Sequence, residues 1–114
     1  MVDEGYNGLA LNESEGDRIA AATGDADIVF MKHYGVLLLA DSIAKAWDDL
    51  YYLERACEVQ HRAQSTGRPL VPVPNAIAEA TAAQMRHEGG WDSAMLHLDS
   101  IKRQLDRVSP GYRR

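Results

Sequence analysis

The chain has 114 residues, enough for one small domain, and its 46% apolar content is ordinary for a globular protein. Its formal net charge of −5 argues against nonspecific nucleic-acid binding, which requires a basic surface. No apolar run approaches the ~20 residues of a membrane-spanning helix, and the acidic N-terminus lacks the apolar core of a signal peptide, so neither a membrane partner nor secretion is expected.

The single cysteine, Cys57, excludes an internal disulfide. It falls among apolar residues of a predicted helix, so we expect a small buried hydrophobe in a cytoplasmic protein. The charges are uneven: residues 1–27 carry seven acids against Arg18, and residues 100–114 carry five bases against Asp106. This pattern fits two solvated faces, or alternatively head-to-tail attraction between copies in an oligomer.

Residues 1–11 contain two glycines and no periodic pattern, so an extended, irregular lead-in is expected. A helix is predicted over residues 13–23. Asn12 suits its N-cap because a short side-chain oxygen accepts a hydrogen bond from the first free N–H groups, and Gly24 suits its end.

Two short apolar runs follow, residues 28–31 and 36–39, separated by the polar Lys32-His33-Tyr34 and Gly35. Their length and β-branched composition predict a β-hairpin with a tight turn near Tyr34-Gly35. Both runs are apolar at every position, which is typical of strands covered on both faces. We therefore expect the chain to associate with further sheet from another copy or from a missing region.

A long helix is predicted over residues 42–64, capped by Asp41 or Ser42 and ended by Gly67 and Pro69. Apolar residues recur along it at helical spacing, and Leu50 and Leu53 at the centre of this stripe are expected in the core. The stripe consists of Ala46, Leu50, Leu53, Cys57 and Gln60, and Ile43, Trp47 and Tyr51 widen it.

The segment 68–74, Arg-Pro-Leu-Val-Pro-Val-Pro, predicts polyproline II. We expect a strap that buries Leu70, Val71 and Val73; a ligand of an SH3-type domain is the alternative. Two helices are then predicted, one from Pro74 or Asn75 to about His87, whose face is formed by Ile77, Ala80, Thr81, Gln84 and Met85, and one from Trp91 to Val108. A break at Gly89-Gly90 separates them, and Ser109-Pro110-Gly111 stops the last helix.

The histidines are His33, His61, His87 and His97. No two of them have the i, i+2 strand spacing or the i, i+4 helix spacing of paired metal ligands, and no phosphate-binding or nucleophile motif is present. From the residues alone, the three helical histidines are surface or packing residues. His33 lies in the predicted turn, and the residues alone do not favour a ligand role for it either.

The order of strand, His-containing turn ending in Gly, apolar strand and helix with Leu-Glu-Arg-Ala-Cys resembles the class II aldolase/adducin family. In that family the turn usually reads Asn-His-Gly, and its His is a ligand of a catalytic divalent metal, commonly zinc. The aligned residues here are His33-Tyr34-Gly35. Tyr34 falls at the metal-ligand position and His33 at the Asn position, so these two are the candidate metal residues.

The resemblance implies an α/β fold, a three-layer α/β/α arrangement around a mostly antiparallel sheet, assembled as a homotetramer. Residues 1–114 would form a single partial domain that resembles the C-terminal half of a family member, with a hairpin and about four helices. The family's upstream His-x-His and acidic residue are not in this sequence. The implied partners are further copies or the missing N-terminal half.

The family chemistry is aldol cleavage or decarboxylation of a small carbonyl substrate through an enolate stabilised by the metal. Tyr112 aligns with a tyrosine that some members use as proton donor, which makes it the candidate catalytic residue. Tyr34 would be a poor zinc ligand because a phenol with a pKa near ~10 is rarely ionised at neutral pH. We expect this chain alone to be inactive. The alternative is a non-catalytic, adducin-like assembly or binding module. The sequence leaves open whether the chain is part of an enzyme.

Overall fold

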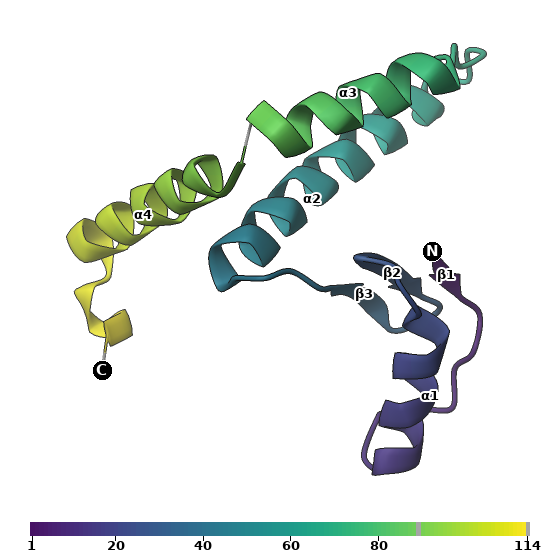
Figure 1. Cartoon of the computed structure of the whole chain (residues 1–114), viewed down its shortest axis with the longest axis horizontal. Coiled ribbons are helices and arrows are strands. Elements are labelled where there is room, and N and C mark those ends of the chain that lie inside the picture. The colour runs from purple at the N-terminus through teal and green to yellow at the C-terminus, as the bar shows by residue number, and fades with distance from the viewer. Residues whose placement is uncertain (89, 114) are drawn as a thin grey trace. The chain divides into compact units, whose positions relative to one another are not determined.

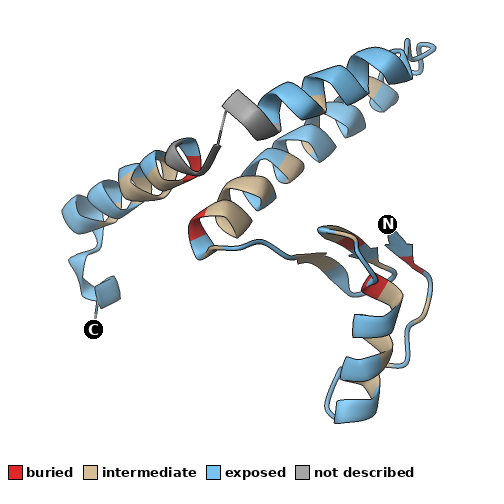
Figure 2. Cartoon of the chain, viewed as in Figure 1, coloured by how far each residue is buried: buried red, intermediate tan, exposed pale blue. Residues whose placement is uncertain are grey.

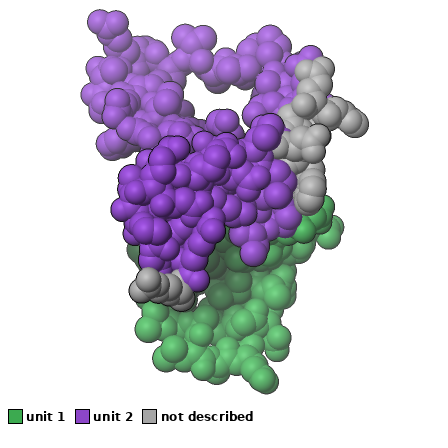
Figure 3. Space-filling view, turned by 90° about the vertical axis from the view of Figure 1, so that its left-hand side faces the viewer, with its two compact units in different colours: residues 1–41 green, residues 42–114 purple. Residues whose placement is uncertain are grey.

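The computed structural model describes residues 1–88 and 90–113, without the side chains of residues 86–92. The chain folds as two compact units, Met1–Asp41 and Ser42–Arg114, which are described separately (Figure 3). Within the described residues, no helix has both the length and the apolar character that crossing a membrane would demand.

The first unit contains a three-stranded sheet in the order β1 (Val2–Asp3), β2 (Ile28–Met31) and β3 (Gly35–Leu38) (Figure 1). The predicted hairpin is β2 and β3, which pair antiparallel, whereas β1 pairs with β2 in parallel. The α/β class is confirmed, but the sheet is mixed rather than mostly antiparallel. The two residues of β1 are too few to produce the alternating pattern that predicts a strand.

Helix α1 (Glu13–Thr23) has the predicted bounds. The side chain of Asn12 accepts a hydrogen bond from the Glu15 N–H at 3.0 Å, and Gly24 follows the last turn with φ of 51°. Positive φ is easily reached only without a Cβ, so both ends of α1 are set by local chemistry.

Helix α1 covers one face of the sheet. Side chains alternate between faces along a strand, so Val29 and Met31 of β2 share a face with Asp3 of β1, to which Arg18 of α1 binds. Val29 is 1% exposed on that face, whereas Phe30, on the opposite face, is 42% exposed (Figure 2). Within this unit, the apolar strands are therefore covered on one side.

The second unit consists of α2 (Ile43–Ser65), α3 (Asn75–Glu88), α4 (Gly90–Val108) and a terminal 3₁₀ turn, η1 (Pro110–Arg113). The predicted helices are confirmed to within one or two residues at their ends. Ser42, not Asp41, caps α2 by accepting a hydrogen bond from the Lys45 N–H at 3.1 Å. The predicted break includes Gly89, which lies outside the described residues, as do the side chains of His87 and Trp91.

Helix α4 packs on one face of α2. Ala44 and Ala94 are buried, and Nδ1 of His97 lies 2.6 Å from Oδ1 of Asp48. The rings of Trp47 and Tyr51 meet the His97 ring edge-on, with centroids 4.5 and 4.8 Å away. The contact therefore combines small buried alanines with one polar pair inside an aromatic cluster.

This packing corrects the predicted core of α2. Leu50 is 41% exposed, Leu53 is half-buried and Cys57 is exposed, so the predictions of a buried Leu50 and a buried Cys57 are wrong. At about 100° per residue, Leu50, Leu53 and Cys57 lie roughly 170° around the helix from the face that carries Ala44 and Asp48. Helix α4 covers the latter face.

Two further predictions of burial are wrong. Leu70, Val71 and Val73 of the proline-rich segment are 45%, 93% and 61% exposed, so this segment does not act as a buried strap within its unit. Ile77 and Met85 on the predicted apolar face of α3 are 57% and 64% exposed (Figure 2). Helical spacing predicted which residues share a face, but these faces have no cover within the second unit.

Replacement of Val29 should destabilise the first unit. Val29→Ala removes two methyl groups from a side chain that is 1% exposed, and should cost about 1.5–3 kcal/mol of unfolding free energy. Val2→Ala, in the same sheet but 61% exposed, is the matched control and should cost about half a kcal/mol or less. Urea unfolding of both variants tests this, and equal losses would contradict the assignment of the covered face.

Candidate functional site

The hairpin turn is formed by Lys32, His33 and Tyr34. The Lys32 N–H donates to the carbonyl oxygen of Asp3 at 2.9 Å, and the Tyr34 N–H donates to that of Met31 at 3.1 Å. His33 has φ of 61°, a left-handed conformation that costs an L-residue with a Cβ roughly 1–2 kcal/mol. The turn is thus held by main-chain bonds at both sides of a strained residue.

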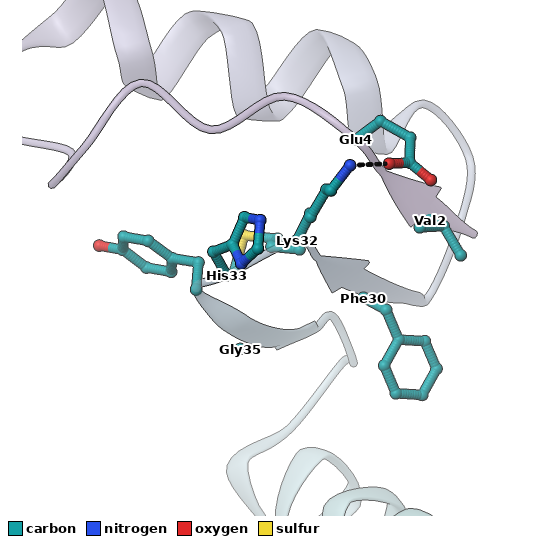
Figure 4. Close-up of a pocket in the computed structure, with 8 residues that line it drawn as sticks. Val2, Glu4, Phe30, Lys32, His33 and Gly35 are labelled. Carbon is teal, nitrogen blue, oxygen red and sulfur yellow. Dashed lines mark ion pairs between the residues drawn. The ribbon is translucent and has the colours of Figure 1, made fainter.

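The turn borders an open hollow of about 570 Å³ (Figure 4). Its apolar lining residues are Val2 and Phe30, which share one face of the sheet, and Met31, and the turn supplies polar groups. The lining residues are Val2, Glu4, Phe30, Met31, Lys32, His33, Tyr34 and Gly35. Both candidate metal residues, His33 and Tyr34, therefore line one hollow, where the Lys32 ammonium binds the Glu4 carboxylate at 2.9 Å.

Tyr6 was not singled out by the sequence, yet it contacts both residues of the turn. Its ring centroid lies 5.9 Å from that of His33, edge-on, and 6.3 Å from that of Tyr34. Such aromatic contacts restrict ring orientation. No periodic or motif signal surrounds Tyr6, which stands in the irregular segment between two glycines.

An ion cluster between α1 and β1 also escaped the sequence analysis. The Arg18 guanidinium donates two bonds to Asp3, Nη1 to Oδ1 at 3.0 Å and Nη2 to Oδ2 at 2.9 Å. Glu15 Oε1 accepts from Nε of Arg18 at 2.9 Å, and Glu15 Oε2 accepts from Asn7 at 3.0 Å. The sequence signal that could have revealed this cluster is its composition, because Arg18 is the only Lys or Arg among the acids of residues 1–27.

These bonds shift the ionisation of all three groups. Hydrogen bonds from Arg18, followed by one from the Gly5 N–H, hold the pKa of Asp3 below its usual 3.8. Arg18 and then Asn7 lower the pKa of Glu15 below 4.5, and the two carboxylates raise the pKa of Arg18. The cluster therefore stays ionised across the neutral range.

Tyr112 lies in η1 of the second unit. Its hydroxyl donates to Oδ1 of Asp106 at 3.0 Å, and Arg113 donates to the same hydroxyl and to Oδ2 of Asp106, at 3.2 and 2.7 Å. The bond to Tyr112, followed by the Asp106 charge, raises the pKa of Arg113. The role of Tyr112 as proton donor stays a prediction.

The side chains around the turn do not make a metal site by themselves. Among the described residues, no three His, Cys, Asp or Glu side chains converge on one point. Near the turn, His33 supplies one imidazole and Glu4 one carboxylate that already binds Lys32. A divalent metal needs three or more protein ligands in such catalytic sites, so the donor set that the described side chains offer does not fit one.

Acid should destabilise the first unit by protonating Asp3 and Glu15. Their pKa values are lower in the folded chain than in the unfolded chain, so the unfolded chain binds more protons in acid. Their stabilisation is complete above the ordinary values of 3.8 and 4.5, and is lost as pH falls through the folded values.

The free energy of unfolding, measured between pH 7 and pH 2, should show this loss. In Asp3→Asn, the curve of this free energy against pH should be flatter at acid pH. Asp99→Asn, which alters an exposed pair with Lys102, is the control and should leave the curve unchanged. An Asp3→Asn curve with the slope of the unmodified chain would contradict the assignment.

Comparison with known proteins gives this geometry a context. The family described as "Class II Aldolase and Adducin N-terminal domain" matches residues 3–61. This range contains the ion cluster, the turn, most of α2 and all residues of the hollow except Val2, and the predicted resemblance is therefore confirmed.

Individual relatives agree with the family. A Pseudomonas aeruginosa protein named as a class 2 aldolase is 36% identical over 112 residues, 95% of this chain and 43% of the relative. The decarboxylase NovR of Streptomyces niveus is 30% identical over 108 residues, 92% of this chain and 39% of the relative.

A solved structure of an aldolase II superfamily protein from Pseudomonas syringae superposes with a TM-score of 0.75 at 30% identity, over 99% of this chain and 45% of that one. The chain thus spans less than half the length of the relatives that it matches. Sequence and fold together place the chain in the class II aldolase and adducin family.

Proposed function

We propose that this chain forms one part of a class II aldolase-like unit that carries out aldol cleavage or decarboxylation of a small carbonyl substrate, and that the chain alone is inactive. The remaining part comes from outside these 114 residues. In this proposal the chain supplies the hollow and the His33-Tyr34 turn beside it. The divalent metal that the resemblance implies would need ligands from the remaining part.

The observation that carries this proposal is the coverage. The chain matches the Pseudomonas aeruginosa relative over 95% of its own length but only 43% of the relative's length. Its exposed apolar surface supports the same view. Phe30 on the open sheet face and Leu50 on α2 are 42% and 41% exposed, and in this proposal the remaining part covers them.

The second candidate is an adducin-like assembly or binding module without catalysis. The observation that favours it is Tyr34 at the position of the family's metal-binding His, together with a donor set that does not fit a metal. Both candidates require a partner that covers the apolar surface. They differ in whether the completed assembly takes up a metal.

The chain alone should hold no tight zinc or manganese, because one imidazole cannot make a three-ligand site. After dialysis against each metal and then against a mild chelator, elemental analysis of the purified chain should find far less than one metal per chain. A stoichiometric metal that survives the chelator would show that the chain builds a site of its own. His33→Ala would then test whether the turn holds it.

Complementation tests the proposal itself. The chain is mixed with the region of the Pseudomonas aeruginosa relative that it does not match, and sedimentation and metal content are measured. We expect a defined complex, with bound metal if the unit is an enzyme and without metal if it is a binding module. A compact monomer of 12.6 kDa that forms no complex and does not self-associate would contradict both candidates.

Two matched variants test whether the apolar stripe of α2 belongs to the interface of this complex. Leu50→Asp places a charge on the stripe and should weaken the complex, because an unpaired charge is costly to bury. Val71→Asp places the same charge on a side chain that is 93% exposed and should have no effect. Equal effects of the two variants would exclude the stripe from the interface.

A further inference from the structure

Arg18 holds two points of the segment that leads from β1 to Tyr6. Its guanidinium forms the two bonds to Asp3, which is 7% exposed, and Nη2 also donates to the carbonyl oxygen of Gly5 at 3.3 Å. The Gly5 N–H in turn donates to Oδ1 of Asp3 at 3.0 Å. A single guanidinium therefore binds both the side chain of Asp3 and the main chain of Gly5.

Gly5 leaves room for this arrangement. A Cβ at this position would lie 2.7 Å from Nη1 and 3.1 Å from Cζ of Arg18, and 3.3 Å from Oδ1 of Asp3. Arg18 cannot easily move aside, since Asp3 and Glu15 fix its guanidinium from two directions. The absence of a side chain at Gly5 is thus a requirement of the contact.

Two links connect this segment to the turn. The carbonyl oxygen of Asp3 accepts the Lys32 N–H at 2.9 Å, so β1 fixes the first residue of the turn. Tyr6 follows Gly5 directly, and its ring lies against the rings of His33 and Tyr34. A displacement of the segment would therefore reach the turn through the main chain and through the Tyr6 ring.

We propose that Arg18 is a positioning residue for the turn: by holding Asp3 and Gly5, it places Lys32 and the Tyr6 ring so that His33 and Tyr34 keep one orientation at the hollow. This inference deepens the proposed function, because the turn belongs to the same site. Arg18 does not line the hollow and acts only through its neighbours.

Three variants of the full chain test the link. Arg18→Lys keeps the charge but loses the planar fork that binds Asp3 twice. Gly5→Ala keeps Arg18 and displaces it. Gly16→Ala is the control, because it makes the same substitution in α1 where a Cβ meets nothing within 4 Å.

NMR supplies two local readouts, the chemical shifts of the His33 ring protons and the exchange rate of the Lys32 amide. In Arg18→Lys and Gly5→Ala, the His33 shifts should move toward those of free histidine and the Lys32 amide should exchange about 10-fold faster. The Leu39 amide, bonded to the Asp27 carbonyl at 2.8 Å, should keep its rate, and Gly16→Ala should change neither readout.

Unchanged His33 shifts and an unchanged Lys32 rate in both variants would overturn the proposal. Equal acceleration at Lys32 and Leu39 would also overturn it, since Arg18 would then stabilise the whole hairpin rather than position the turn. Both readouts are measured without metal, substrate or partner. The proposed function can therefore fail in the complementation experiment while this inference holds, and the reverse is equally possible.

Discussion

The two bonds between Arg18 and Asp3 determine how the first unit is assembled. Strand β1 has two residues and could not hold its place through strand pairing alone. A fork of two parallel N–H···O bonds fixes both distance and orientation, which a single charge would not. Because Asp3 is 7% exposed, its carboxylate needs this partner, since burial without one would be costly. The same pair thus joins α1 to the sheet and completes the third strand.

The second unit is held together by a different kind of contact. Among its described side chains the buried ones are alanines, and its contact between α2 and α4 includes Asp48 and His97 beside aromatic rings. Alanines let helices approach closely but bury little apolar surface, so this contact contributes modestly to stability. The larger side chains Leu50, Ile77 and Met85 remain exposed. The unit therefore resembles part of a packed layer, which agrees with a chain that spans under half of its relatives.

Local signals predicted the elements well. Asn12 and Ser42 begin helices where expected, and Gly24 ends one, because capping depends on residues a few positions apart. Burial depends on which neighbour reaches a face, and the sequence of one helix does not contain that information. Hence α4 packs against Ala44 and Asp48, and the more apolar stripe with Leu50 is left open. The site residues His33 and Tyr34 came from the resemblance, whereas Tyr6 and Arg18 needed the three-dimensional structure.

The identity of residue 34 affects the chemistry of the turn but not the backbone conformation that the turn requires. The turn needs a positive φ at His33 and a glycine that opens β3, and neither requirement depends on whether residue 34 is His or Tyr. If Tyr34 stands where the resemblance puts the family's metal-binding His, the backbone of the turn would persist without that imidazole. The Tyr34 ring contacts Tyr6, and its side chain carries a hydroxyl group where an imidazole would carry a ring nitrogen. Family membership follows from the sequence and the fold, and it does not by itself decide whether this chain takes part in metal binding.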